Sequence, residues 1–241
     1  MKRIRLVVFA LSVMVSGCTS SNEVATTPDA AVTAQKILKA ARSCLGGEKA
    51  VNGFATIRAQ AKVKGPGSEF VSTVWSGSDG RARMELTGGF AAGSHPSGNW
   101  RVDRASGTSV TLHDEELAFV RGHELHATVL APQSRYDKPT FDGEAKFADQ
   151  EALVVSMTDH LGKPVRAYFS VVDTLPLGFR MTQPEPDVVV TLGGWEWRQD
   201  LFVFTRATIA QGEEDFYYDY IDIQMNNVPD SVFVAPGIAN R

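Results

Sequence analysis

The sequence predicts an α+β fold, mostly β, in which one antiparallel sheet closes over two or more helices. Two segments show helical spacing of apolar residues, and about ten short segments show strand patterns. The strand patterns follow one another directly, without the regular strand–helix alternation of parallel sheets. We therefore expect one antiparallel sheet that closes over the helices.

The N-terminus carries the features of an export signal. Three basic residues precede an apolar run, Leu6 to Cys18, which is too short to span a bilayer, since a spanning helix needs roughly 20 residues. This combination is typical of a signal peptide and not of a transmembrane helix. We expect residues 1–17 to be removed during export.

The apolar run ends in Val15-Ser16-Gly17-Cys18, which resembles the lipobox of bacterial lipoproteins. In such proteins the cysteine sulfur carries a diacylglycerol and the new N-terminus is acylated. The resemblance implies a lipid anchor on Cys18, and several acyl chains on one residue suffice for stable attachment. An ordinary signal peptide with a chance cysteine is the alternative. An aspartate directly after the cysteine would resemble the signal that retains lipoproteins in the inner membrane. No aspartate follows Cys18, so we expect the protein at the periplasmic face of the outer membrane.

The charge balance excludes one class of partner. Removing Lys2, Arg3 and Arg5 lowers the basic residues from 24 to 21 against 28 acidic ones, so the net charge moves from −4 to −7. No cluster of basic residues remains, and binding to nucleic acid depends on such clusters. The length that remains suits a single domain.

The first helix is expected after a tether. Residues 18–33 are rich in Ser, Thr, Ala and Asn and are interpreted as the lipidated N-terminus and a flexible tether, with the domain at 34–241. Helical spacing predicts a helix from Ala34 to about Leu45, capped by Thr33 and ended by Gly46-Gly47. Cys44 lies on its apolar side, which favours a small buried residue over a reactive thiol.

Strand patterns dominate the rest of the chain. The segment Arg81 to Thr87 alternates between apolar and charged residues, which predicts a strand with one covered face. A glycine-rich loop is expected from Gly88 to Gly98, with Phe90 as its large apolar residue, and a second helix from Asp114 to Leu130. Further strands are expected at Ala55–Lys64, Glu69–Ser76, Asn99–Asp103, Ser109–Leu112, Thr140–Phe147, Ala152–Thr158, Val165–Asp173, Leu177–Thr182, Asp187–Leu192, Leu201–Ile209 and Phe216–Met225.

Several short motifs occur in a fixed order along the chain. They are Ala41-Arg42-Ser43-Cys44-Leu45-Gly46-Gly47, Ile57-Arg58-Ala59, Asp79-Gly80, Gly98-Asn99-Trp100, Asp173-Thr174-Leu175-Pro176, and an ending with Asn227, Pro229, Phe233 and Pro236. This order, which spans most of residues 34 to 236, resembles the LolA/LolB-type family of periplasmic lipoprotein carriers and outer-membrane lipoprotein-sorting proteins. The resemblance implies a strongly curved antiparallel sheet, a half-open barrel, whose concave side holds helices and a cavity for acyl chains or other hydrophobic ligands.

Aromatic residues on the expected strands are the candidates for ligand binding. The resemblance also implies an exposed apolar residue on a protruding loop, and Phe90 lies in a comparable place. The expected ligand-binding residues are Phe90, Trp75, Trp100, Phe202, Phe204 and Tyr218. The alternative is that these residues form a plain core with cross-strand aromatic pairs.

One histidine motif suggests metal chemistry but departs from the required spacing. A zinc protease needs histidines at i and i+4 on one helical face, whereas His123-Glu124-Leu125-His126 separates them by three. We expect no bound metal and no cofactor. No nucleophile elbow, phosphate-binding loop or dinucleotide fingerprint is present, so we do not expect an enzyme.

These observations lead to one functional hypothesis and one alternative. The first is an outer-membrane-anchored lipoprotein that binds acyl chains, lipid or lipoprotein in a hydrophobic half-barrel cavity, as part of lipoprotein or lipid sorting. Its partners would be the membrane, through the N-terminal lipid, and a hydrophobic ligand. The alternative is a non-catalytic structural or protein-interaction module of the cell envelope with a filled core.

Overall fold

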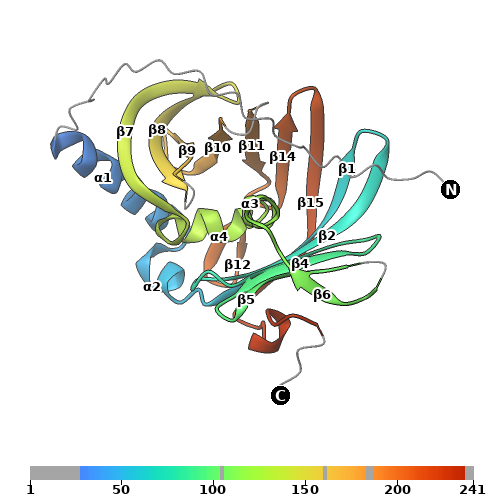
Figure 1. The fold of residues 1–241 in the computed structure, drawn as a ribbon. Coiled ribbons are helices and arrows are strands. Elements are labelled where there is room, and N and C mark those ends of the chain that lie inside the picture. Colours follow the sequence, from blue (N-terminus) through green and yellow to red (C-terminus); the bar gives the residue numbers. More distant parts are fainter. Residues whose placement is uncertain (1–27, 104–105, 160–161, 183–186, 237–241) are drawn as a thin grey trace, which may run out of the picture.

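An antiparallel sheet of thirteen strands forms most of the structure, a computed structural model that describes residues 28–103, 106–159, 162–182 and 187–236 (Figure 1). The strand order is β6-β5-β4-β3-β2-β1-β15-β14-β11-β10-β9-β8-β7, and β12 pairs with β13 in a separate ribbon. The strands are β1 (Thr56–Gly65), β2 (Ser68–Gly77), β3 (Ala82–Leu86), β4 (Phe90–His95), β5 (Gly98–Val102), β6 (Ser109–Thr111), β7 (Tyr136–Phe147), β8 (Gln150–Asp159), β9 (Pro164–Ser170), β10 (Pro176–Met181), β11 (Val188–Gly193), β12 (Glu196–Arg198), β13 (Leu201–Val203), β14 (Arg206–Gln211) and β15 (Glu214–Met225).

The sheet is strongly curved. Its first and last strands in chain order, β1 and β15, lie side by side in the middle of the sheet. Ile57 of β1 pairs with Met225 of β15; from β1 the strands run in chain order out to β6, and from β15 they run in reverse order out to β7. Register shifts interrupt the β1–β15, β9–β10 and β7–β8 pairs, and such bulges increase bending. Figure 1 shows β7 and β8 as strongly bent strands, with helix α1 (Pro28–Cys44) beside β7. The prediction of a curved antiparallel sheet over helices is confirmed.

The described residues form four α-helices on the concave side of the sheet or at its rim: α1 (Pro28–Cys44), α2 (Gly47–Asn52), α3 (Asp114–Gly122) and α4 (Leu125–Leu130). Two short 3₁₀ turns, η1 (Pro132–Ser134) and η2 (Asp230–Val232), follow α4 and β15. No helix among the described residues is long and apolar enough to cross a membrane.

Both helix predictions need correction. The first helix begins at Pro28 and not at Ala34, and proline is well suited to the first turn of a helix. The second helix was expected to run unbroken from Asp114 to Leu130, but it is divided at His123 and Glu124. Gly122 weakens the helix there, and Glu124 adopts a non-helical ψ of 44°.

The core lies mainly between the sheet and the helices. Ile37 of α1, Leu45 just after this helix and Leu130 of α4 pack in one cluster with inward-facing residues such as Phe169 and Phe179. Helix α3 covers a second cluster on β2–β4 through Val120. A third, smaller cluster lies on β7–β10, and it includes Phe147 and Tyr168.

The expected glycine-rich loop at Gly88–Gly98 is wrong, because most of this segment is strand. Phe90 opens β4, pairs with Leu86 and is half-buried. The backbone conformation explains two of the glycines. Gly88 and Gly89 have φ of 102° and 98° in the turn before β4, a conformation that favours glycine. A Cβ on Gly93 would lie 2.7 Å from the indole of Trp100, so this strand position has no room for a side chain.

Candidate binding site

A small apolar cavity lies between α1, α4 and strands β8–β10. Its volume is about 10 Å³. The residues around it are Leu38, Ala41, Arg42, Leu45, Thr128, Val129, Pro132, Met157, Ala167, Phe169, Pro176 and Phe179. A hollow of this size holds about one water molecule. An acyl chain would therefore fit between these elements only after α1 or α4 has moved.

A second cavity of about 10 Å³ lies where α3 meets α4. Its lining combines apolar strand residues with the polar residues of the helix break: Ile57, Ala59, Val74, Ser76, His123, Glu124, Leu125, His126 and Tyr220. In this structure, side chains fill most of the space between the sheet and the helices around both cavities.

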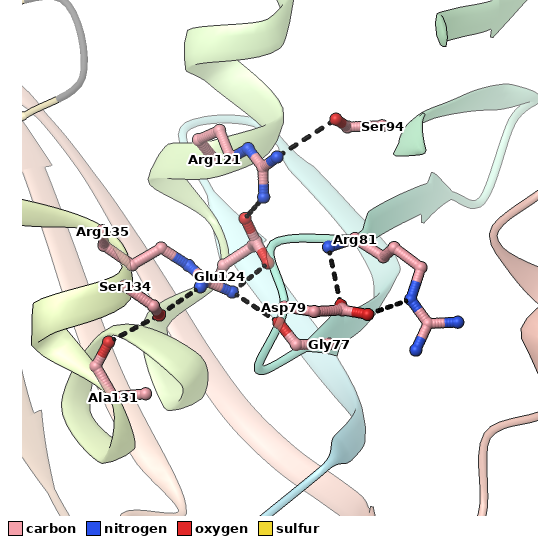
Figure 2. Close-up of polar contacts among 9 residues, drawn as sticks. All are labelled: Gly77, Asp79, Arg81, Ser94, Arg121, Glu124, Ala131, Ser134 and Arg135. Carbon is pink, nitrogen blue, oxygen red and sulfur yellow. Dashed lines mark hydrogen bonds and ion pairs between the residues drawn. The ribbon is translucent and has the colours of Figure 1, made fainter. Parts of the chain in front are cut away.

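An ionic cluster holds the α3–α4 junction against the sheet. The fully buried carboxylate of Glu124 accepts hydrogen bonds from Arg121 at 2.8 Å and from Arg135 at 3.0 Å. Arg121 also donates to the hydroxyl of Ser94 on β4, and Arg135 donates to the carbonyl of Gly77 at the end of β2. Figure 2 shows the two guanidinium groups on either side of the carboxylate. The cluster thus joins the helices to two separate strands.

A neighbouring ion pair joins the β2–β3 turn to the C-terminal segment. Arg81 donates to Asp79 at 2.7 Å (Figure 2) and to Asp230 at 2.5 Å. Burial alone would raise the pKa of Asp79, but the hydrogen bonds and the charge of Arg81 outweigh it, and that pKa is lowered. The turn is therefore fixed at the rim of the ionic cluster.

Aromatic rings form a continuous row that leads from α3 past β15 to the β12–β13 ribbon. The successive ring-centre distances are Phe90–Phe119 5.9 Å, Phe119–His123 4.4 Å, His123–Tyr218 6.2 Å, Tyr218–Tyr220 6.3 Å, Tyr220–Phe204 5.5 Å, Phe204–Trp195 5.7 Å, Trp195–Phe202 5.7 Å and Phe202–Trp197 5.2 Å. Phe119 is 46% exposed and Trp197 61%, whereas Phe204 is fully buried. Burial raises the pKa of Tyr218 and, with the charge of Tyr218 added, that of Tyr220.

The structure brings four of the six predicted aromatic residues together. Phe90, Phe202, Phe204 and Tyr218 belong to the aromatic row, as described above.

The other two, Trp75 and Trp100, lie on the face of the sheet that points away from the helices. Val74 packs under α3, and because successive strand residues point to opposite faces, Trp75 points away from it. The guanidinium of Arg83 lies over both indoles, at 5.5 Å and 5.3 Å from the ring centres. The indole N–H of Trp100 donates to the carbonyl of Phe233 at 3.0 Å, so the C-terminal segment covers this ring.

The ring nitrogens of the two histidines in the motif lie within hydrogen-bonding distance of different main-chain carbonyls. His123 Nδ1 lies 2.8 Å from the carbonyl of Phe119, and His126 Nε2 lies 3.0 Å from that of Phe204. Burial lowers the pKa of both rings, for His126 to about 4. Among the described residues, no group of three or more His, Cys, Asp or Glu is arranged to hold a metal ion.

Stability should fall as the pH falls from about 6.5 to about 4, because His126 is held neutral in the folded state. An unfolded histidine has a pKa of about 6.5. Between the two values the unfolded chain binds a proton that the folded chain does not, so His126 contributes a loss of about 3 kcal/mol across this window. Urea unfolding at several pH values measures it, and His126→Gln should reduce the slope by this share, while His123, whose pKa burial also lowers, keeps its own contribution. The control His95→Gln should keep the full slope, and an unchanged slope in His126→Gln would contradict the assignment.

Sequence reasoning missed the charged residues of the site. Glu124 was considered only as part of a histidine motif, although it is the residue that organises the junction. Its partner Arg135 lies beyond α4, and no local pattern links the two positions. Arg42 was noted only within a family motif, but its side chain reaches the rim of the apolar cavity.

Comparison with solved structures defines the class of fold. No known family model matches the sequence, and no curated protein matches it. In three dimensions, however, the chain is similar in fold to solved structures that include a LolA superfamily protein. The predicted resemblance to LolA/LolB-type proteins is thereby confirmed at the level of the fold.

Three crystal structures represent this likeness. A LolA superfamily protein from Nitrosomonas europaea has a TM-score of 0.60 at 13% identity, and the match covers 83% of this chain and 97% of that one. An outer membrane lipoprotein-sorting protein domain from Vibrio parahaemolyticus has a TM-score of 0.57 at 13% identity, with the same coverage. A DUF1329 family protein from Desulfovibrio piger has a TM-score of 0.57 at 10% identity and covers 87% and 97%.

Proposed function

We propose that this protein is an outer-membrane-anchored lipoprotein that binds an acyl chain of a lipid or lipoprotein and takes part in lipid or lipoprotein sorting. The site is the cavity between α1, α4 and β8–β10. The observation that carries the proposal is the apolar lining of this cavity, formed by residues such as Leu38, Met157, Phe169 and Phe179. The proposal assigns no catalytic step, cofactor or metal ion to the protein.

Entry of a chain requires α1 to move away from the sheet. Among the described side chains, Ala34, Ile37 and Ala41 of this helix and Leu45 just after it are buried, and two of these four side chains are single methyl groups. Because the hydrophobic contribution scales with buried apolar area, a face rich in alanine is displaced at lower cost than one of large residues. An incoming acyl chain would replace the lost contacts with Met157, Phe169 and Phe179.

The small volume of the cavity supports a second candidate function. A hollow of about 10 Å³ is what a structural or protein-interaction module with a filled core would have. The two functions differ in whether the protein carries a non-covalent lipid. Native mass spectrometry of protein purified from membranes tests this, with the same sample measured after denaturation to separate bound lipid from the covalent anchor. Lipid lost on denaturation supports the first function; its absence, together with no uptake of a fluorescent fatty acid, supports the second.

Cys18→Ala should abolish lipidation. Cys18 lies outside the described residues, and its lipidation is proposed from the lipobox-like Val15-to-Cys18 motif. Metabolic labelling with a fatty acid should mark the wild-type protein and leave Cys18→Ala unlabelled and in the soluble fraction. Cys44→Ala is the matched control, since it removes the other cysteine and should keep the label. Equal labelling of wild type and Cys18→Ala would disprove the anchor.

A further inference from the structure

One charged residue lies at the apolar cavity. Of the cavity-lining residues in the described ranges, Arg42 alone carries a charge. It is half-buried in the last turn of α1, and its guanidinium donates to the side-chain carbonyl of the exposed Asn52 at 2.5 Å. The cation therefore lies at the rim, where the apolar lining meets solvent.

Arg42 has no acidic partner in the part of the chain that the structure describes. No carboxylate oxygen of the described residues lies within 4.0 Å of its guanidinium, whereas Arg121 and Arg135 both bind the carboxylate of Glu124. The neutral amide of Asn52 does not balance a full positive charge. The C-terminal end of the α1 dipole supplies only about half a negative charge. The guanidinium thus retains the capacity to bind an anion in its planar, two-pronged geometry.

We propose that the cavity selects amphiphiles with an anionic head group, a carboxylate or a phosphate. The apolar chain lies between α1 and β8–β10, and the head group replaces Asn52 as the partner of Arg42. This inference rests on the proposed function and sharpens it, because the diacylglyceryl group of a lipoprotein carries no charge and a fatty acid or a phospholipid does. The apolar lining favours the chain, and Arg42 decides the head group.

Calorimetric titration of the full-length, delipidated protein with three ligands of the same ten-carbon chain tests the proposal. The ligands are decanoate, decyl phosphate and 1-decanol, at neutral pH. We expect both anions to bind about tenfold or more tightly than the alcohol, because hydrogen bonds to charged groups are worth that much. Raising the salt concentration should weaken the anions and leave the alcohol unchanged. The stronger of the two anions identifies the head group.

Two variants assign the preference to Arg42. Arg42→Gln should bind all three ligands with the affinity that wild type has for the alcohol. Lys39→Gln, which removes an exposed cation from the same helix, should behave as wild type. The comparison of ligands and the salt dependence require no variant, so the result stands even if Arg42→Gln folds poorly.

Three outcomes would overturn the inference. Equal affinity of wild type for decanoate, decyl phosphate and 1-decanol would show that head-group charge is not recognised, while acyl binding itself stands. An unchanged preference in Arg42→Gln, or a loss of preference in Lys39→Gln, would place the anion elsewhere. Binding of none of the three ligands would overturn the proposed function together with the inference.

Discussion

Glu124→Gln should lower the free energy of unfolding by about 3–5 kcal/mol, because it leaves the buried guanidinium of Arg135 and the partly buried one of Arg121 without their counter-charge. The carboxylate has no exposed surface, and the side chain of Arg135 is only 6% exposed, whereas that of Arg121 is 21% exposed. Water cannot replace the lost partner of Arg135, and glutamine can offer only one neutral acceptor. For a domain of this size the change corresponds to a fall in Tm of about 10 °C. Urea unfolding followed by circular dichroism measures it.

The matched control is Glu151→Gln, in the exposed pair between Lys146 and Glu151. That pair is 3.9 Å apart with both side chains mostly exposed, so its loss should cost less than about 0.5 kcal/mol. If Glu124→Gln were no more destabilising than this control, the cluster would not hold the α3–α4 junction. Arg135→Met added to Glu124→Gln should recover part of the loss, since it removes one of the two unpaired charges.

Thr174→Cys should reduce acyl-chain uptake to background under oxidising conditions, by joining α1 to the turn between β9 and β10. The sulfur of Cys44 lies 3.6 Å from the hydroxyl of Thr174, so a cysteine there lies close to disulfide geometry. Thr174 has a φ of 58°, which is less favourable for a β-branched residue than for cysteine. Cys44 adjoins Ala41 and Leu45, so the bond would hold the helical wall of the cavity in place.

Uptake of a fluorescent fatty acid measures the effect, and reduction with a thiol should restore it. The double variant Cys44→Ser with Thr174→Cys cannot form the bond and should take up the ligand in both conditions. Uptake by the oxidised Thr174→Cys protein at the wild-type rate would show that the chain does not enter by displacement of α1. Mass spectrometry confirms that the disulfide has formed.

The fold could be predicted from the sequence because strands and turns are local signals. The alternation in Arg81–Thr87 marks β3, and consecutive strand patterns without intervening helices indicate an antiparallel sheet. The glycines of residues 88–98 led to the wrong prediction of a loop. Gly93 has no room for a side chain because Trp100 lies against it, and these two residues are neighbours only across the sheet. At the break between α3 and α4, Glu124 accepts from Arg135, which lies beyond α4, and no local pattern indicates this contact.

The site was less predictable, because its parts come from distant elements. Aromatic content singled out Phe204 and Tyr218, which belong to the aromatic row and not to the lining of the cavity between α1, α4 and β8–β10. It also could not say that Trp75 faces the other side, since both faces of several strands carry bulky residues. The sequence alone also does not show that Arg42 is the single charged residue among the described residues that line the cavity. Its lack of an acidic partner within the described residues is not determined by neighbours in sequence either.

The pairing of the first strand with the last has a consequence for biogenesis. Ile57 of β1 pairs with Met225 of β15, which are far apart in the sequence. The β1–β15 pair therefore cannot form while β15 is still being synthesised. Such long-range contacts also slow folding, because loop closure must precede any gain from pairing. A chain built this way can complete the centre of its sheet only after the C-terminal strand has been made.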